Sequence, residues 1–154
     1  MEGFLGRGLA HFQENKIDPN EIVETRLYPD MLPFRFQVLA TAHHAIGAIR
    51  GVKAGLFAPP AQLPPLDYAG LQQAVTEARE ALQQLVPADV NALEGKDVVF
   101  QIRDTKIPFT AEGFIQSFSL PNFYFHATTT YDILRSKGVP LGKRDFLGRM
   151  RLKT

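Results

Sequence analysis

The sequence predicts an all-α protein, an antiparallel four-helix bundle with a small β-hairpin inserted near residues 98–109. Apolar residues recur at helical spacing in four long segments, whereas alternating apolar and polar residues occur in one short segment. The chain has 154 residues, 45% hydrophobic and 21% charged, which indicates one globular domain over residues 1–154. The four long helices are expected at residues 2–15, 33–52, 68–85 and 121–137.

The first half of the chain supplies two of these helices. A shorter helical piece lies between them, to about Leu27, because Asp18 can cap it and Pro19 suits its first turn. A proline-rich segment, residues 58–65, is too rich in proline for helix or sheet, and it is expected to be an ordered crossover. The second long helix has a continuous apolar stripe formed by Phe34, Val38, Ala42, Ala45, Ile49 and Val52.

The third long helix and the hairpin follow the crossover. Asp67 is placed to cap the helix that starts at residue 68. From Val98 to Ile102 apolar and polar residues alternate, and Asp104–Thr105 is a suitable turn. Pro108 lacks a backbone donor, so the second strand is expected at the edge of the hairpin.

The last part of the chain is helical again. Thr110 and Gly113 bracket a helix start, and Leu120–Pro121 is expected to break or kink that helix. The final long helix runs from this proline to Lys137, and Gly138 is its natural C-cap.

Composition excludes several classes of function. The chain has no cysteine, so disulfides, thiolate metal sites and cysteine nucleophiles are excluded. The formal net charge is +1, which gives no field to attract nucleic acid, and no nucleic-acid partner is expected. No apolar run approaches ~18 residues and no targeting segment is recognised, so we expect a cytoplasmic protein without a membrane partner.

Four histidines are the candidates for chemistry, and His126 is the most informative. Asn122 and His126 stand at positions i and i+4 of the last helix and project from the same edge, as two ligands from one helix would. Hydrogen bonds at the edge of the core would explain the same pair without a ligand. His43 and His44 are adjacent in the second long helix and diverge by about 100°, so at most one of them can face a site shared with His126.

The stretch from residue 120 to residue 148 resembles the end of the last core helix in the DinB/YfiT-like superfamily of bacterial four-helix bundles. The shared pattern is Leu-Arg-x-x-Gly-x-Pro, which this chain carries as Leu134, Arg135, Gly138 and Pro140. The resemblance implies a bundle that is often dimeric, so a homodimer is expected, and that often binds a metal ion. The order of the expected elements is similar over most of the chain, but the residues specific to the superfamily lie only in this stretch.

The same resemblance implies a metal site. It aligns His126 with the second histidine of a His-x-x-x-His motif, Asn122 with the first, and the pair His43 and His44 with the third ligand of the superfamily. Asn122 is a departure from that motif, because an amide oxygen is a poor donor to zinc or nickel and suits harder ions. The cofactor expected is therefore a divalent metal ion (Zn, Ni or Mn) or none.

Two functions follow from the resemblance, and the sequence leaves both open. One is a metal-dependent enzyme acting on a small molecule, of the hydrolase or thiol transferase type. The other is a non-catalytic dimeric bundle with a degenerate metal site that binds a small ligand or none. The sequence identifies no catalytic residue and no substrate.

Overall fold

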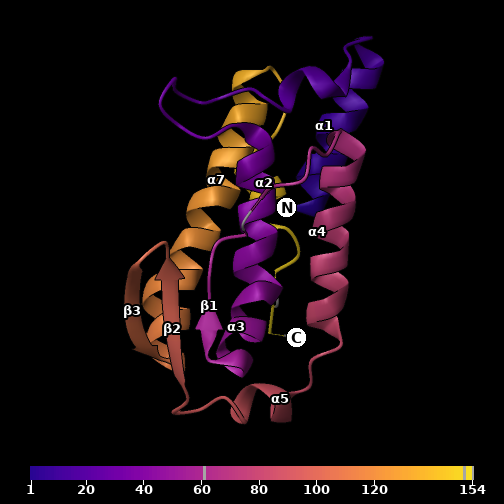
Figure 1. Cartoon of the computed structure of the whole chain (residues 1–154). Coiled ribbons are helices and arrows are strands. Elements are labelled where there is room, and N and C mark those ends of the chain that lie inside the picture. Colours follow the sequence, from indigo (N-terminus) through magenta and orange to yellow (C-terminus); the bar gives the residue numbers. More distant parts are fainter. Residues whose placement is uncertain (61, 151, 154) are drawn as a thin grey trace.

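The computed structural model describes residues 1–60, 62–150 and 152–153. Most of these residues are helical, and a small three-stranded sheet lies beside one end of the long helices (Figure 1). Helix α2 packs between α7 and α4, and α1 packs against α4. The long helical elements are α1 (Glu2–Glu14), α2 (Phe34–Ala42), α3 (Ala48–Ala54), α4 (Tyr68–Gln83) and α7 (Leu120–Ser136).

The second long helix is present but contains a π-helical segment. Helix α2 continues through η2 (His43–Gly47) into α3, and Gly55, with φ of 73°, ends it. A π-helical turn holds more residues than an α-helical turn, and such segments are frequent at functional sites. The helix therefore spans the predicted range, with an irregularity at its two histidines that the apolar stripe did not indicate.

Of the break or kink expected at Leu120–Pro121, the break is absent. The short helix α6 (Ala111–Phe114) continues through a second π-helical segment, η3 (Ile115–Ser119), directly into α7. Pro121 lies in the first turn of α7, where the π-helical segment already changes the pattern of backbone hydrogen bonds. The missing N–H of the proline therefore interrupts no regular helix. Thr110 caps α6 as predicted, since its hydroxyl accepts from the Gly113 N–H.

The predicted hairpin is present and has a third strand that was not predicted. Strands β2 (Asp97–Ile102) and β3 (Thr105–Thr110) pair antiparallel, with Pro108 in the edge strand. Strand β1 (Leu56–Phe57) pairs parallel with the other side of β2. Two residues are too few to show an alternating pattern, so no local pattern predicts β1.

Short helices fill the connections. The piece expected to reach Leu27 is shorter, because η1 (Pro19–Ile22) gives way to a loop whose Val23 and Thr25 carbonyls accept from the first N–H groups of α2. The caps at Asp18 and Asp67 are both present, each carboxylate accepting from a backbone N–H of its helix. The two remaining short helices, α5 (Pro87–Asn91) and α8 (Lys143–Leu147), were not predicted.

The buried apolar residues form two clusters. The larger one lies among α1, α2, α4 and α7 and includes Val139 and Leu141 beyond α7. The smaller one lies among α3, the sheet and α6 and includes Phe57 and Phe114. Among the described residues, none of the helices has the combination of length and hydrophobicity needed to cross a bilayer.

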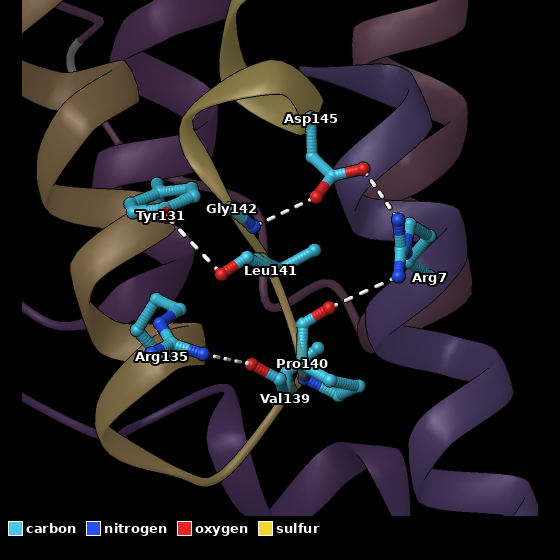
Figure 2. A network of polar contacts seen from close by, with 8 residues as sticks. All are labelled: Arg7, Tyr131, Arg135, Val139, Pro140, Leu141, Gly142 and Asp145. Atoms are coloured by element: carbon cyan, nitrogen blue, oxygen red, sulfur yellow. Dashed lines mark hydrogen bonds and ion pairs between the residues drawn. The ribbon is translucent and has the colours of Figure 1, made fainter.

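The chain beyond α7 is tied to α1 and α7 by a network of polar contacts (Figure 2). Arg7 on α1 donates to the Pro140 carbonyl at 3.0 Å and forms an ion pair with Asp145. From α7, Arg135 donates to the Val139 carbonyl at 3.3 Å. The Asp145 carboxylate also accepts from the Gly142 N–H, a bond that is the main cause of the lowered pKa of Asp145. The Leu-Arg-x-x-Gly-x-Pro pattern therefore encodes a turn that returns the chain to the first helix.

Replacing Gly138 in this turn by Ala is expected to lower the free energy of unfolding by about 1–2 kcal/mol. Gly138 has φ of +86°, a left-handed conformation that a Cβ makes unfavourable. Urea denaturation measures the change. Gly6→Ala is the matched control, because Gly6 lies on the exposed side of α1 with no atom within 4 Å of an added Cβ. That variant should gain up to about 1 kcal/mol, and a loss of equal size in both variants would contradict the assignment.

Candidate functional site

A cavity of about 220 Å³ lies where α2 and η2 face α7, beside strands β1 and β2. All four residues that the sequence singled out line it: His43, His44, Asn122 and His126. The other walls are apolar and include four aromatic side chains, Phe36, Phe57, Phe100 and Phe118. The described residues that line the cavity include no Lys, Arg, Asp or Glu. The cavity therefore has apolar walls with imidazole and amide groups as its polar part.

His126 is held by a buried glutamine. Its Nδ1 lies 2.8 Å from Oε1 of Gln37, whose Nε2 donates to the Leu32 carbonyl at 2.8 Å. An amide oxygen only accepts, so Nδ1 of His126 carries the proton. Nε2 of His126 then has a lone pair and makes no hydrogen bond within the described part of the chain.

His44 is held in the same way by a buried serine. The Ser119 hydroxyl donates to the His44 carbonyl at 2.9 Å, so its oxygen accepts from Nδ1–H of the His44 ring at 3.3 Å. The rings of His44 and His126 stack with an interplanar angle of 19° and a centroid distance of 6.0 Å. Two imidazoles from α7 and η2 thus lie side by side, each with Nδ1–H bonded to protein and Nε2 left free.

His43 has a different environment, although it lines the same cavity. Its Nε2–H donates to the Ala58 carbonyl at 2.9 Å, and its ring lies 4.6 Å from the ring of Phe57. Both adjacent histidines thus line the cavity together with His126, and only His44 stacks on His126. That at most one of them shares a ligand site with His126 stays a prediction.

Asn122 lies one turn before His126 and turns its amide nitrogen to its own helix. Nδ2 donates to the Phe118 carbonyl at 2.7 Å. The amide oxygen makes no hydrogen bond to any residue that the structure describes, so it is the group that Asn122 can offer to the cavity.

Burial keeps the histidines of the cavity neutral. It is the largest cause of the lowered pKa of His43, His44 and His126. For His44 the neighbouring His126 and His43 add to the effect, and its pKa falls to about 4. At neutral pH the free Nε2 atoms are therefore unprotonated, as a metal ligand or a hydrogen-bond acceptor must be.

The described residues contain no group of three or more His, Cys, Asp or Glu side chains that could hold a metal ion. The donors that the structure brings together are two imidazole nitrogens, from His44 and His126, and the amide oxygen of Asn122. They are fewer donors than a closed metal site has, so an ion held by them would leave most coordination positions to water or a ligand.

Two residues of the site were missed by the sequence analysis. Gln37 is a polar residue between Phe36 and Val38 in α2, and only 2% of its surface is exposed. Ser119 is 1% exposed and lies at the end of η3. The signal for Gln37 was its polarity beside the apolar stripe, whereas the sequence carries no comparable signal for Ser119.

The helical fold and its histidine-lined cavity define a DinB-like protein. A solved structure described as a DinB family member protein from Shewanella denitrificans is similar to the chain, with a TM-score of 0.75 and 25% identity, covering 97% of this chain and 84% of that chain. The chain matches the family described as "Domain of unknown function (DUF1993)" over residues 1–147, and it therefore belongs to this family. No curated protein matches the chain. The resemblance to DinB-like proteins stated from the sequence is confirmed. The alignment of Asn122 and His126 with a His-x-x-x-His motif stays a prediction.

Proposed function

We propose that the cavity binds a small molecule beside a divalent metal ion held by His44 and His126. The observation that carries this proposal is the state of the two imidazoles. Both are neutral, both have Nδ1–H bonded to a buried protein acceptor, and both keep the Nε2 lone pair. Histidines that bind metals commonly use one ring nitrogen for the ion and donate the other N–H to the protein.

The donor set supports particular metals and a particular kind of chemistry. Two imidazoles suit Zn and Ni, whereas the amide oxygen of Asn122 favours a harder ion such as Mn over zinc. A bound divalent ion supplies a Lewis acid that polarises a carbonyl and lowers the pKa of bound water or of a thiol. The aromatic walls would hold the apolar part of the substrate. This chemistry corresponds to a hydrolase or a thiol transferase.

A second candidate is a non-catalytic pocket with a degenerate metal site. The observation that favours it is that the described residues contain no group of three or more His, Cys, Asp or Glu side chains that could hold a metal ion. His43 lines the same cavity, but its Nε2 is bonded to the Ala58 carbonyl. Without a metal, the free Nε2 atoms would act only as acceptors, so the pocket would take a small neutral ligand with an apolar body and an N–H or O–H donor.

Further expectations from the sequence complete the proposal. The long helices would form the antiparallel four-helix bundle of the DinB/YfiT-like type, in a single domain over residues 1–154. The exposed Leu120, Tyr124 and Phe125 on α7 support a homodimer that pairs through this helix. A cytoplasmic location and the lack of nucleic-acid and membrane partners stay predictions.

Metal titration of protein without an affinity tag tests the proposal. Calorimetry with Zn²⁺, Ni²⁺ and Mn²⁺, each added alone, is expected to give one site per chain, and His126→Ala should abolish it because one of the two imidazoles is removed. His11→Ala is the matched control, since His11 lies on α1 and does not line the cavity. If none of the three ions binds the unaltered protein, the metal-dependent function is wrong and the second candidate stands.

A further inference from the structure

Gln37 is a buried amide in the face of α2 that packs against α7. Its neighbours on this helix, Phe34 and Val38, are fully buried apolar residues, and Gln37 itself is 2% exposed. A buried amide costs free energy unless its donors and its acceptor are satisfied. An apolar residue would fill this position without such a requirement, so the presence of a glutamine needs a reason.

The hydrogen bonds of Gln37 fix the direction of its amide. The Leu32 carbonyl can only accept, so the group that faces it at 2.8 Å must be the NH₂ of Gln37. The amide oxygen must then face His126, whose Nδ1 lies 2.8 Å away. The reverse orientation would place two acceptors against each other at Leu32. The carbonyl of Leu32 thereby determines, through Gln37, which ring nitrogen of His126 carries the proton.

Both ends of this chain of contacts are held in place. Leu32 belongs to the loop before α2, which is bonded to the first turn of the helix by the Phe34 N–H to Thr25 carbonyl contact at 2.8 Å. At the other end, the ring of His126 has edge contacts with Phe36 and Phe125, at centroid distances of 5.6 and 5.3 Å. The imidazole therefore has a fixed orientation as well as a fixed tautomer.

We propose that Gln37 is the positioning residue of the cavity, which holds His126 in the Nδ1–H tautomer so that Nε2 keeps its lone pair for the ligand. The value of this arrangement for metal binding rests on the proposed function, whereas the tautomer itself does not. Gln37 acts through His126 and does not line the cavity.

Long-range ¹H–¹⁵N NMR of the imidazoles tests the tautomer without any metal. In the unaltered protein, the His126 signals should show a protonated Nδ1 and an unprotonated Nε2. Gln37→Met keeps a long unbranched side chain but removes the acceptor, so Nε2–H is expected to appear and the Nε2 signal to shift. Gln37→Glu, as a buried carboxylic acid, keeps an O–H donor for the Leu32 carbonyl and an acceptor for Nδ1–H, so it should keep the Nδ1–H tautomer.

The control separates positioning from general damage to the fold. Ser119→Ala removes the acceptor beside His44 and should change the His44 signals while those of His126 stay as they are. An Nε2–H tautomer of His126 in the unaltered protein would overturn the proposal without any variant. An unchanged tautomer in Gln37→Met would overturn it as well, as would an Nε2–H tautomer in Gln37→Glu.

Measuring metal affinity provides a second test with the same variants. Removing the partner of a metal-binding histidine typically costs 10–100-fold in affinity, so Gln37→Met should weaken binding by about that factor, and Gln37→Glu should bind more tightly than Gln37→Met. If the unaltered protein binds no metal but shows the expected tautomer, the metal function fails and the positioning role of Gln37 stands. If metal binds and Gln37→Met leaves the affinity unchanged, the positioning role fails alone.

Discussion

Replacing Phe114 by Ala is expected to lower the free energy of unfolding by about 3–5 kcal/mol, because the truncation leaves a cavity in the smaller apolar cluster. Phe114 has no exposed surface. Its ring lies 5.0 Å from Phe57, 5.5 Å from Phe118 and 5.8 Å from Phe109, measured between centroids. These partners come from the sheet and from η3, so the loss would affect the packing of both. Urea denaturation followed by circular dichroism measures the change.

Tyr28→Ala is the control for this variant. Tyr28 is also aromatic, but 66% of its surface is exposed in the loop before α2, and its removal should change the free energy of unfolding by no more than about 0.5 kcal/mol. Equal losses in the two variants would show that the rings around Phe114 do not form a core.

Acid is expected to destabilise the protein through His44. Its pKa is about 4 in the folded protein, against the ordinary 6.5. Below pH 6.5 the unfolded chain therefore binds a proton that the folded protein does not, and stability falls until the pH reaches about 4. A difference of this size corresponds to about 3.4 kcal/mol at 1.36 kcal/mol per pKa unit. The ring lies at a cavity that solvent reaches, and screening reduces the expected loss to about 1–2 kcal/mol.

The contribution of His44 is isolated by measuring the free energy of unfolding at two pH values, in a variant and in the unaltered protein. His44→Phe keeps an aromatic ring beside Phe57 and Phe118 but cannot be protonated. The loss of stability between about pH 7.5 and about pH 4.5 should be smaller in this variant than in the unaltered protein by about 1–2 kcal/mol. His11→Phe, with its change on α1 outside the cavity, should keep the full loss. Equal losses in His44→Phe and the unaltered protein would contradict the assignment.

The sequence predicted the parts of the fold that local patterns determine. The long helices follow from apolar stripes that repeat over several turns, and the caps at Asp67 and Thr110 follow from side chains that reach their own helix. The π-helical segments could not be predicted, because their residues have helical dihedral angles and only packing against another helix decides where the extra residue fits. Strand β1 depends on pairing with β2, about 40 residues along the chain.

The candidate site also has features that local patterns predict and features that depend on packing between distant parts of the chain. The spacing of Asn122 and His126 placed both side chains on one edge of α7, because four residues make about one helical turn. The choice between His43 and His44 depends on contacts with α7 and β1, which adjacent positions in one helix cannot indicate. Gln37 and Ser119 bond to histidines 89 and 75 residues away, so their roles appear only once the helices are packed.

The segments η2 and η3 touch through the bonds between His44 and Ser119. Each carries a residue in excess of what a regular helix would place in the same length. A single-codon deletion in either one would remove that excess residue and make the turn regular. The flanking helices would keep their positions, but His44 or Ser119 would shift and the bonds between the two side chains would be lost. Each π-helical segment therefore depends on the other for its side-chain partner, although the two lie more than 70 residues apart.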